Sequence, residues 1–182
     1  GLSGALIGGT LNRIMIAEME MPASLVGLFF AVPLLVSPAR IWFGYRSDGF
    51  MLFGKRREPY IVLGALLIGL GIISIATLSI NLAGSAMLAV GVFVAFLIYG
   101  VGRNLGHNTF QALVADRFEG EAGRGRAVTM YEVATLLGLI MGAGGLGKAL
   151  EHYDPASLTQ VAIGVAVIVL VLATFAAIKQ EP

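Results

Sequence analysis

Residues 59–102 read PYIVLGALLIGLGIISIATLSINLAGSAMLAVGVFVAFLIYGVG and contain no Asp, Glu, Lys or Arg. A helix needs roughly 20 apolar residues to cross a bilayer, so this stretch is long enough for two crossings. The segment from Asn81 to Gly84 interrupts it, and Asn and Gly are typical of tight turns. The stretch therefore predicts two membrane helices joined by a short turn.

The rest of the chain continues this pattern, with further charge-free runs at 21–39, 133–147 and 155–178. Of the 182 residues, 57% are hydrophobic and 13% are charged, whereas soluble domains carry about a quarter charged residues. We predict an all-α, polytopic membrane protein that contacts the lipid bilayer. Its six transmembrane helices are expected near 1–17, 23–43, 60–80, 85–114, 126–147 and 156–178, with loops near 45–59 and 115–125.

The composition excludes several other classes of protein. The absence of Cys removes disulfides, Cys-based zinc sites and thiol nucleophiles. A net charge of +1 gives no basic field for nucleic acid, so no nucleic-acid partner is expected. His152 stands near Asp154 without a nucleophile or a metal-ligating partner, and we expect no enzyme activity. The N-terminal sequence Gly1-Leu2-Ser3-Gly4 lacks the basic segment of a signal peptide, and we expect the chain to be part of a longer protein.

The basic residues predict the orientation of the spans. Lys148 is the one basic residue near the loops on one side of the membrane. Nine lie on the other side, in or beside the loops after spans two and four and after the last span: Arg40, Arg46, Lys55, Arg56, Arg57, Arg117, Arg124, Arg126 and Lys179. Because Lys and Arg collect in cytoplasmic loops, both ends of this segment are expected to be cytoplasmic.

The loop after the second span contains a recognisable motif. It runs Gly44-Tyr-Arg-Ser-Asp48 and then Gly54-Lys-Arg-Arg57. On composition it is a solvated loop that sets topology; the alternative is a gating latch in which Asp48 pairs with Arg56 and Arg57. The pattern resembles the signature loop of the major facilitator superfamily, in which six spans form one half of a twelve-span transporter. Five residues separate Asp48 from Gly54, where most transporters have two.

That longer spacing is similar to the PucC-type branch of the superfamily. The stretches GTLNRIMIAE at 9–18, PASLVG at 22–27 and AVPLLVSPAR at 31–40 are also similar to that branch. The resemblance implies a protein of the bacterial inner, photosynthetic membrane that assembles light-harvesting complexes. It would bind or deliver (bacterio)chlorophyll, with carotenoid a second possible pigment, and its partners would be light-harvesting or reaction-centre polypeptides. Alternatives are a major-facilitator transporter of a small solute, or a structural subunit of a photosynthetic complex.

The fourth span has a polar face. Asn104, His107, Asn108 and Gln111 follow the spacing i, i+3, i+4 and i+7, which places them on one side of a helix. They form either a cytoplasmic extension of a long helix or the lining of a pigment or substrate site. In the second interpretation His107 is an axial ligand for chlorophyll magnesium, and its other ring nitrogen needs a neighbour such as Asn104 or Asn108.

Three more ionisable residues fall inside predicted spans. Arg103 and Glu132 are expected to pair, because unpaired charges are costly in a bilayer, and Arg126 is a second possible partner for Glu132. Arg13 has no acidic partner in the sequence; a carbonyl group, a pigment, a lipid headgroup or another part of a longer protein could satisfy it. The glycines of the run 138–147 predict close helix packing, or else a flat surface for a tetrapyrrole or carotenoid.

Overall fold

The computed structural model describes residues 2–18, 21–39, 42, 58–80, 86–152 and 154–177, and every regular element in these ranges is helical. The first span consists of α1 (Leu2–Gly4) and two π-helical segments, η1 (Ala5–Leu11) and η2 (Ile14–Glu18). The second span is α2 (Ala23–Val36), which ends in the 3-10 turn η3 (Ser37–Ala39). Four long helices follow: α4 (Glu58–Ile80), α5 (Ala86–Arg117), α6 (Gly120–Ala149) and α7 (Pro155–Ala177).

Four of these helices, α4 to α7, are long and apolar enough to cross a membrane, and two shorter apolar helices cover Ala5–Ile16 and Ala23–Val36. Many of their residues are Ile, Val and Gly, which are weak helix formers in water. In a bilayer, however, each backbone N–H and C=O must be hydrogen-bonded within its own segment, and this favours the helix regardless of propensity. The protein is an all-α, polytopic membrane protein, as the charge-free runs predicted.

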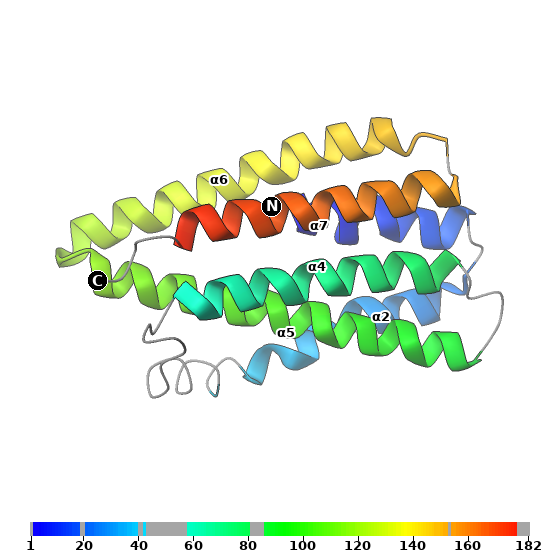
Figure 1. Ribbon diagram of the computed structural model, residues 1–182, viewed down its shortest axis with the longest axis horizontal. Coiled ribbons are helices and arrows are strands. Elements are labelled where there is room, and N and C mark those ends of the chain that lie inside the picture. The colour runs from blue at the N-terminus through cyan, green and yellow to red at the C-terminus, as the bar shows by residue number, and fades with distance from the viewer. Residues whose placement is uncertain are drawn as a thin grey trace.

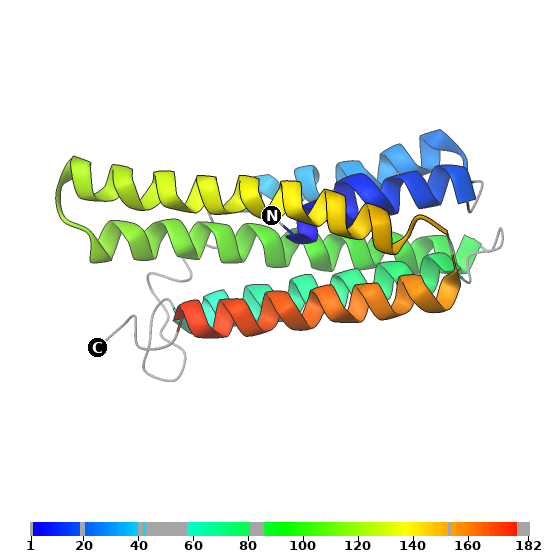
Figure 2. The same cartoon turned by 90° about the horizontal axis from the view of Figure 1, so that it is seen from above.

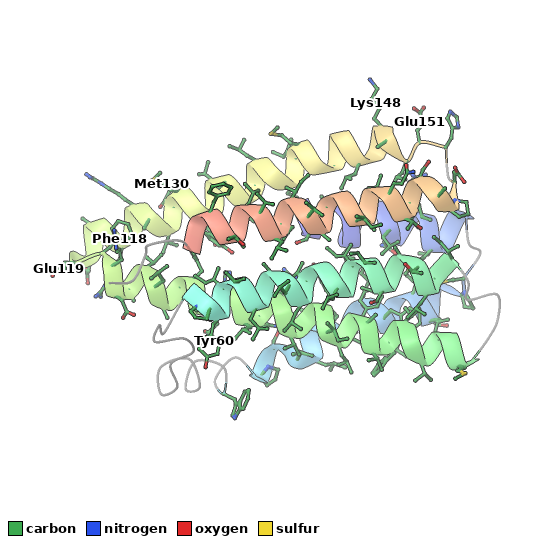
Figure 3. All side chains as sticks on the ribbon, in the orientation of Figure 1. Tyr60, Phe118, Glu119, Met130, Lys148 and Glu151 are labelled. Atoms are coloured by element: carbon green, nitrogen blue, oxygen red, sulfur yellow. The ribbon has the colours of Figure 1, made fainter. Side chains whose placement is uncertain are left out.

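The helices pack around α4 and α5 (Figure 1). α4 contacts both α5 and α7, and α2 packs on α5. α6 runs along the N-terminal helical segment, as the second view shows (Figure 2). Within α6 only Gly142 and Leu146 are buried, while Met130, labelled in Figure 3, and Met141 are each 73% exposed. α6 therefore presents an apolar outer surface, suited to contact with lipid.

Aromatic side chains fill the contact between α2 and α5. Phe29 of α2 stacks on Phe96 of α5, with ring centroids 5.7 Å apart. Phe30 meets the same ring at 5.2 Å in a tilted arrangement. Both Phe29 and Phe96 are fully buried, so this aromatic group is the centre of the core on that side.

Glycines bring α4 and α5 into close contact, and this corrects one prediction. A Cβ atom on Gly102 would lie 2.6 Å from the Leu67 Cβ atom, and one on Gly71 would lie 2.7 Å from the Tyr99 Cβ atom. In the predicted glycine run of α6, by contrast, a Cβ on Gly144, Gly145 or Gly147 would meet nothing within 4 Å. The prediction of close packing there is wrong for these three glycines, because that part of α6 has no neighbouring helix against those positions.

The predicted loop at 115–125 is also wrong in extent. α5 continues to Arg117 and α6 begins at Gly120, so only Phe118 and Glu119 separate the two helices. Gly120 makes the sharp turn possible with a φ of +77°, which L residues with a side chain rarely adopt. Arg124 then donates from Nε to the Phe118 carbonyl at 3.0 Å and from Nη2 to the Ala115 carbonyl at 3.1 Å. The guanidinium thus satisfies carbonyls at the end of α5 that have no helical partner.

The second predicted span was expected to reach residue 43; in the described residues α2 ends at Val36, the 3-10 turn follows, and Trp42 is helical again. Pro33 lies inside this helix, where it lacks the N–H of a helical hydrogen bond, and Pro38 lies in the following 3-10 turn. The Ser37 hydroxyl donates to the Pro33 carbonyl at 3.5 Å. The α-helix therefore continues past Pro33, and the backbone changes to a 3-10 turn around Pro38.

Candidate functional site

The polar face of α5 lies in the half of the helix nearest the turn into α6. Asn104 is buried, and its Nδ2 atom donates to the Gly100 carbonyl at 2.9 Å, one turn earlier in the same helix. His107 and Asn108 are half-buried, and Gln111 is exposed. The polar face therefore becomes more exposed from Asn104 towards the end of α5. Thr109 and Leu113, on the other side of the helix, are buried.

His107 has a partner on α6. Its Nδ1 atom and the Tyr131 hydroxyl are joined by a 2.9 Å hydrogen bond. The Tyr131 ring also stacks on Phe110, one turn further along α5, with centroids 4.6 Å apart. Two contacts of different kinds therefore fix the Tyr131 ring between the helices. The sequence suggested Asn104 or Asn108 as a neighbour for a ring nitrogen of His107, and Tyr131 of α6 is a partner that it did not name.

This hydrogen bond fits the requirements of a metal-ligating histidine. If Nδ1 carries the proton and donates to the Tyr131 oxygen, the Nε2 lone pair is the one that can point at a metal. Histidines that bind metals usually donate their other ring N–H in this way, which fixes the tautomer and the ring orientation. If a tetrapyrrole binds at this face, His107 is the described residue that would hold its magnesium, as a single imidazole nitrogen donor. Among the described residues no group of three or more His, Asp or Glu side chains could hold a free metal ion.

Arg103 lies on the same side of α5, four residues before His107. It is close enough to the Tyr99 and Tyr131 hydroxyl groups to interact with both electrostatically. Ser3, from the N-terminal helix, lies beside the same Tyr99 hydroxyl. The Tyr99 hydroxyl thus has polar neighbours from the N-terminal helix and from α5, in a region that the sequence marked only by Arg103 and His107.

The predicted ion pair between Arg103 and Glu132 is not formed. Both side chains are exposed, and no salt bridge joins them in the described ranges. Tyr131 faces α5, and the next residue along a helix projects about 100° away, so Glu132 points to one side of the contact. The alternative pair of Glu132 with Arg126 is not formed either, for these two described residues lie six positions apart and on different faces of α6.

Arg13 binds a backbone carbonyl, which is one of the partners that the sequence left open. Its Nη2 atom donates to the Leu150 oxygen at 2.8 Å, just beyond the last residue of α6. The last carbonyls of a helix lack intrahelical partners and carry partial negative charge, so a guanidinium there is favourable. Arg13 therefore attaches the first span to the end of α6.

The predicted gating residues Asp48, Arg56 and Arg57 lie outside the described residues. The predicted site residues that the structure does describe fall into three places, one of which is Glu132 on α6. Asn104, His107, Asn108 and Gln111 share a face of α5 with Arg103, whereas Arg13 lies at the far end of α6. Tyr131 is the important residue that sequence reasoning missed, although a Tyr beside Glu132 in a predicted span is a polar signal that could have found it.

The comparisons with known proteins agree with the motifs of the first spans. A family model described as PUCC protein matches residues 10–182. The chain is 36% identical over 190 residues to Protein PucC of Rhodovulum sulfidophilum, covering 100% of this chain and 42% of that protein. It is 35% identical over 191 residues to Protein PucC of Cereibacter sphaeroides, covering 100% of this chain and 41% of that protein.

A third relative is named Bacteriochlorophyll synthase 44.5 kDa chain, from Rhodobacter capsulatus. It is 30% identical over 173 residues, covering 94% of this chain and 39% of that protein. The chain thus spans about two fifths of the length of these curated relatives. No solved structure matches it.

Proposed function

Because this chain belongs to the PUCC protein family, we propose that it is part of a non-enzymatic membrane assembly factor for light-harvesting complexes, and that it binds or delivers (bacterio)chlorophyll. The name of one relative, Bacteriochlorophyll synthase 44.5 kDa chain, refers to bacteriochlorophyll and supports this proposal. The observation that carries the proposal is the hydrogen bond between His107 and Tyr131, since it orients a half-buried imidazole inside a candidate membrane span.

In this proposal His107 would hold the magnesium of the pigment through Nε2, and the Tyr131 hydroxyl oxygen would accept the hydrogen bond that Nδ1–H donates. Phe110 and the Tyr131 ring offer aromatic surface beside the ligand. When bound, the pigment would supply light absorption and a Lewis-acidic magnesium. Asn104, Asn108 and Gln111 would line the polar side of the site, and a carotenoid would fit the uncovered glycine-rich surface of α6. The partners would be light-harvesting or reaction-centre polypeptides in the bacterial photosynthetic membrane.

The test is the pigment content of the purified full-length protein, expressed in a phototrophic host and extracted in mild detergent. We expect tetrapyrrole absorbance and co-purifying small antenna polypeptides. His107→Leu should remove the absorbance while the protein still inserts, because Leu is a good helix former and is easier to insert than His. His152→Leu is the matched control, since His152 is the only other His and is exposed in the loop after α6.

A wild-type protein without pigment and without antenna polypeptides would refute the proposal. Equal pigment content in His107→Leu and wild type would refute the ligand assignment alone. Tyr131→Phe should weaken pigment binding by roughly tenfold or more, as loss of an outer hydrogen bond to a metal-bound histidine typically does.

Solute transport by a major-facilitator-type protein is a second candidate. It is supported by Arg103 and Glu132, which are charged, exposed and close to the middle of candidate spans. For that mechanism we propose that Asp48 pairs with Arg56 and Arg57 in a gating latch. Asp48→Ala would then impair the protein more than Arg57→Ala, because it leaves several like charges unpaired; the opposite order would exclude the latch.

A further inference from the structure

The side of α5 that faces the first span is buried over only part of its length. Tyr99 is buried on that side, and Ser3 of the first span lies beside its hydroxyl group. Arg103 follows one turn later on the same side of α5 and is exposed. The side that contacts α4 through Gly102 does not change in this way, because Thr109, about two turns further along, is still fully buried.

α6 loses its burial in the same direction. Three of its residues are spaced seven apart, which is close to two helical turns, so they lie on one side of the helix. Leu146 is 8% exposed and belongs to the buried cluster that α6 forms with the first span. Leu139 is 42% exposed, and Glu132 is exposed as well. Burial on this side of α6 therefore decreases from Leu146 towards Glu132.

The first span explains where both helices lose their cover. It begins about midway along α6, as both ribbon views show (Figures 1 and 2). From Leu2 to Glu18 it extends about 25 Å at roughly 1.5 Å per residue, which is less than the roughly 30 Å of a hydrocarbon core. The uncovered sides of α5 and α6 lie beyond its first turn, in line with it.

Lipid chains are a poor cover for these two surfaces. Arg103 and Glu132 are charged, and both lie inside candidate membrane spans. Charged side chains at such positions face protein or water rather than lipid. The chain spans about two fifths of the length of its curated relatives, so more than half of such a protein lies outside it and can supply the cover.

We propose that the segment preceding Gly1 in the longer protein continues the first span as a helix for about two more turns, and that it packs against α5 and α6 beside Arg103, Leu139 and Glu132. Two turns add about 11 Å, which brings the span to the length that a crossing needs. The segment would place polar groups opposite Arg103 and Glu132 and apolar groups against Leu139. It would also stand beside His107 as one wall of the proposed site, but the inference does not depend on pigment binding.

The first experiment measures how well this side of α6 is covered in the full-length protein in lipid vesicles. Single variants Glu132→Cys and Leu139→Cys are spin-labelled, and their collisions with oxygen, which concentrates in lipid, are measured by electron paramagnetic resonance. Leu146→Cys is the buried reference. Met130→Cys is the lipid-exposed reference, because Met130 is 73% exposed and lies about 160° around the helix from Glu132. We expect both test positions to lose oxygen access to the level of Leu146→Cys.

The second experiment identifies the covering segment. The 182 residues contain no Cys, and any Cys elsewhere in the full-length protein is replaced by Ser. A new Cys is placed in turn at each of about eight positions before Gly1, which is two helical turns, together with Glu132→Cys. Oxidation should form disulfides at positions three or four residues apart, on one face of a helix. Met130→Cys, combined with the same positions, is the matched control and should form none.

Each outcome decides for or against the segment. Oxygen access at Glu132→Cys and Leu139→Cys equal to that of Met130→Cys would overturn the proposal, because lipid would then cover this side of α6. Strong access of a water-soluble nickel complex to both positions would overturn it in favour of a water-filled space. Protection without a disulfide to any position before Gly1 would overturn the assignment to that segment. None of these results alters the pigment content that tests the proposed function.

Discussion

Replacing Gly102 by Ala should destabilise the protein, whereas replacing Gly147 by Ala should not. Both changes add one methyl group to a glycine inside a long helix. At Gly102 the new Cβ would lie 2.6 Å from the Leu67 Cβ and 2.7 Å from the Gly64 carbonyl oxygen. At Gly147 it would meet nothing within 4 Å. The two variants therefore share their chemistry and differ only in their surroundings.

The magnitude follows from the distances. Ordinary contact begins at 3.4 Å, so the Cβ at 2.6 Å requires α4 and α5 to move apart by about 0.8 Å. Overpacking of this kind costs about 1–3 kcal/mol, and backbone atoms and a Cβ cannot rotate away, which favours the upper half of that range. Alanine returns about 1 kcal/mol of helix propensity at either site. The expected net change is a loss of about 1–2 kcal/mol for Gly102→Ala and a gain of up to about 1 kcal/mol for Gly147→Ala.

The assay is reversible unfolding of the purified protein by SDS in mixed micelles, followed by far-UV circular dichroism. The two variants should differ by about 2–3 kcal/mol, or roughly 30- to 150-fold in the unfolding equilibrium constant. Gly71→Ala should behave like Gly102→Ala, since its Cβ would lie 2.7 Å from that of Tyr99. Equal stabilities for Gly102→Ala and Gly147→Ala would refute the assignment of the close contact to α4 and α5.

Three other predictions concern separate parts of the molecule. Arg13→Gln removes the hydrogen bond to the Leu150 carbonyl, so it should lower the free energy of unfolding by about 1 kcal/mol and speed amide hydrogen exchange at the end of α6. Unchanged exchange there would contradict the role of Arg13. Thr109→Val should raise that free energy by about 1 kcal/mol, since the Thr109 hydroxyl is buried and has no hydrogen-bond partner among the described residues; a loss of stability would show that the hydroxyl is bonded. Because the chain has no Cys, the single variants Glu121→Cys and Glu151→Cys can each be labelled with a thiol reagent in intact cells and in inverted vesicles. We expect Glu121→Cys to react from the cytoplasm and Glu151→Cys from the opposite side. Labelling of both from one side would exclude the proposed orientation.

The spans could be predicted from sequence because the cause of a membrane helix is local. A run without charges must satisfy its own backbone in lipid, whatever surrounds it. Their ends were less predictable. The turn at Gly120 depends on a positive φ and on Arg124 reaching back to α5, and neither is visible in a hydropathy pattern.

Contacts between helices could not be predicted in the same way, because they depend on how each helix is rotated about its axis. The sequence favoured the glycine run of α6 for close packing, yet the close contact involves Gly102, in the spacing Gly102-x-x-x-Gly106 of α5. Both stretches fit the small-residue pattern of membrane helix contacts. Only the positions of the neighbouring helices distinguish Gly102 from Gly147.

The position of α6 depends on polar contacts to an unusual degree. Its outer surface is exposed and apolar, and only two of its residues are buried. Tyr131 joins it to His107 on α5, and the carbonyl after its last residue joins it to Arg13 of the first span. Helices in lipid associate through van der Waals packing and interhelical hydrogen bonds rather than through hydrophobic burial, so both bonds contribute to the association. The proposed pigment ligand is therefore also one of the attachments of α6, and a ligand bound at His107 would act directly on a contact that positions this helix.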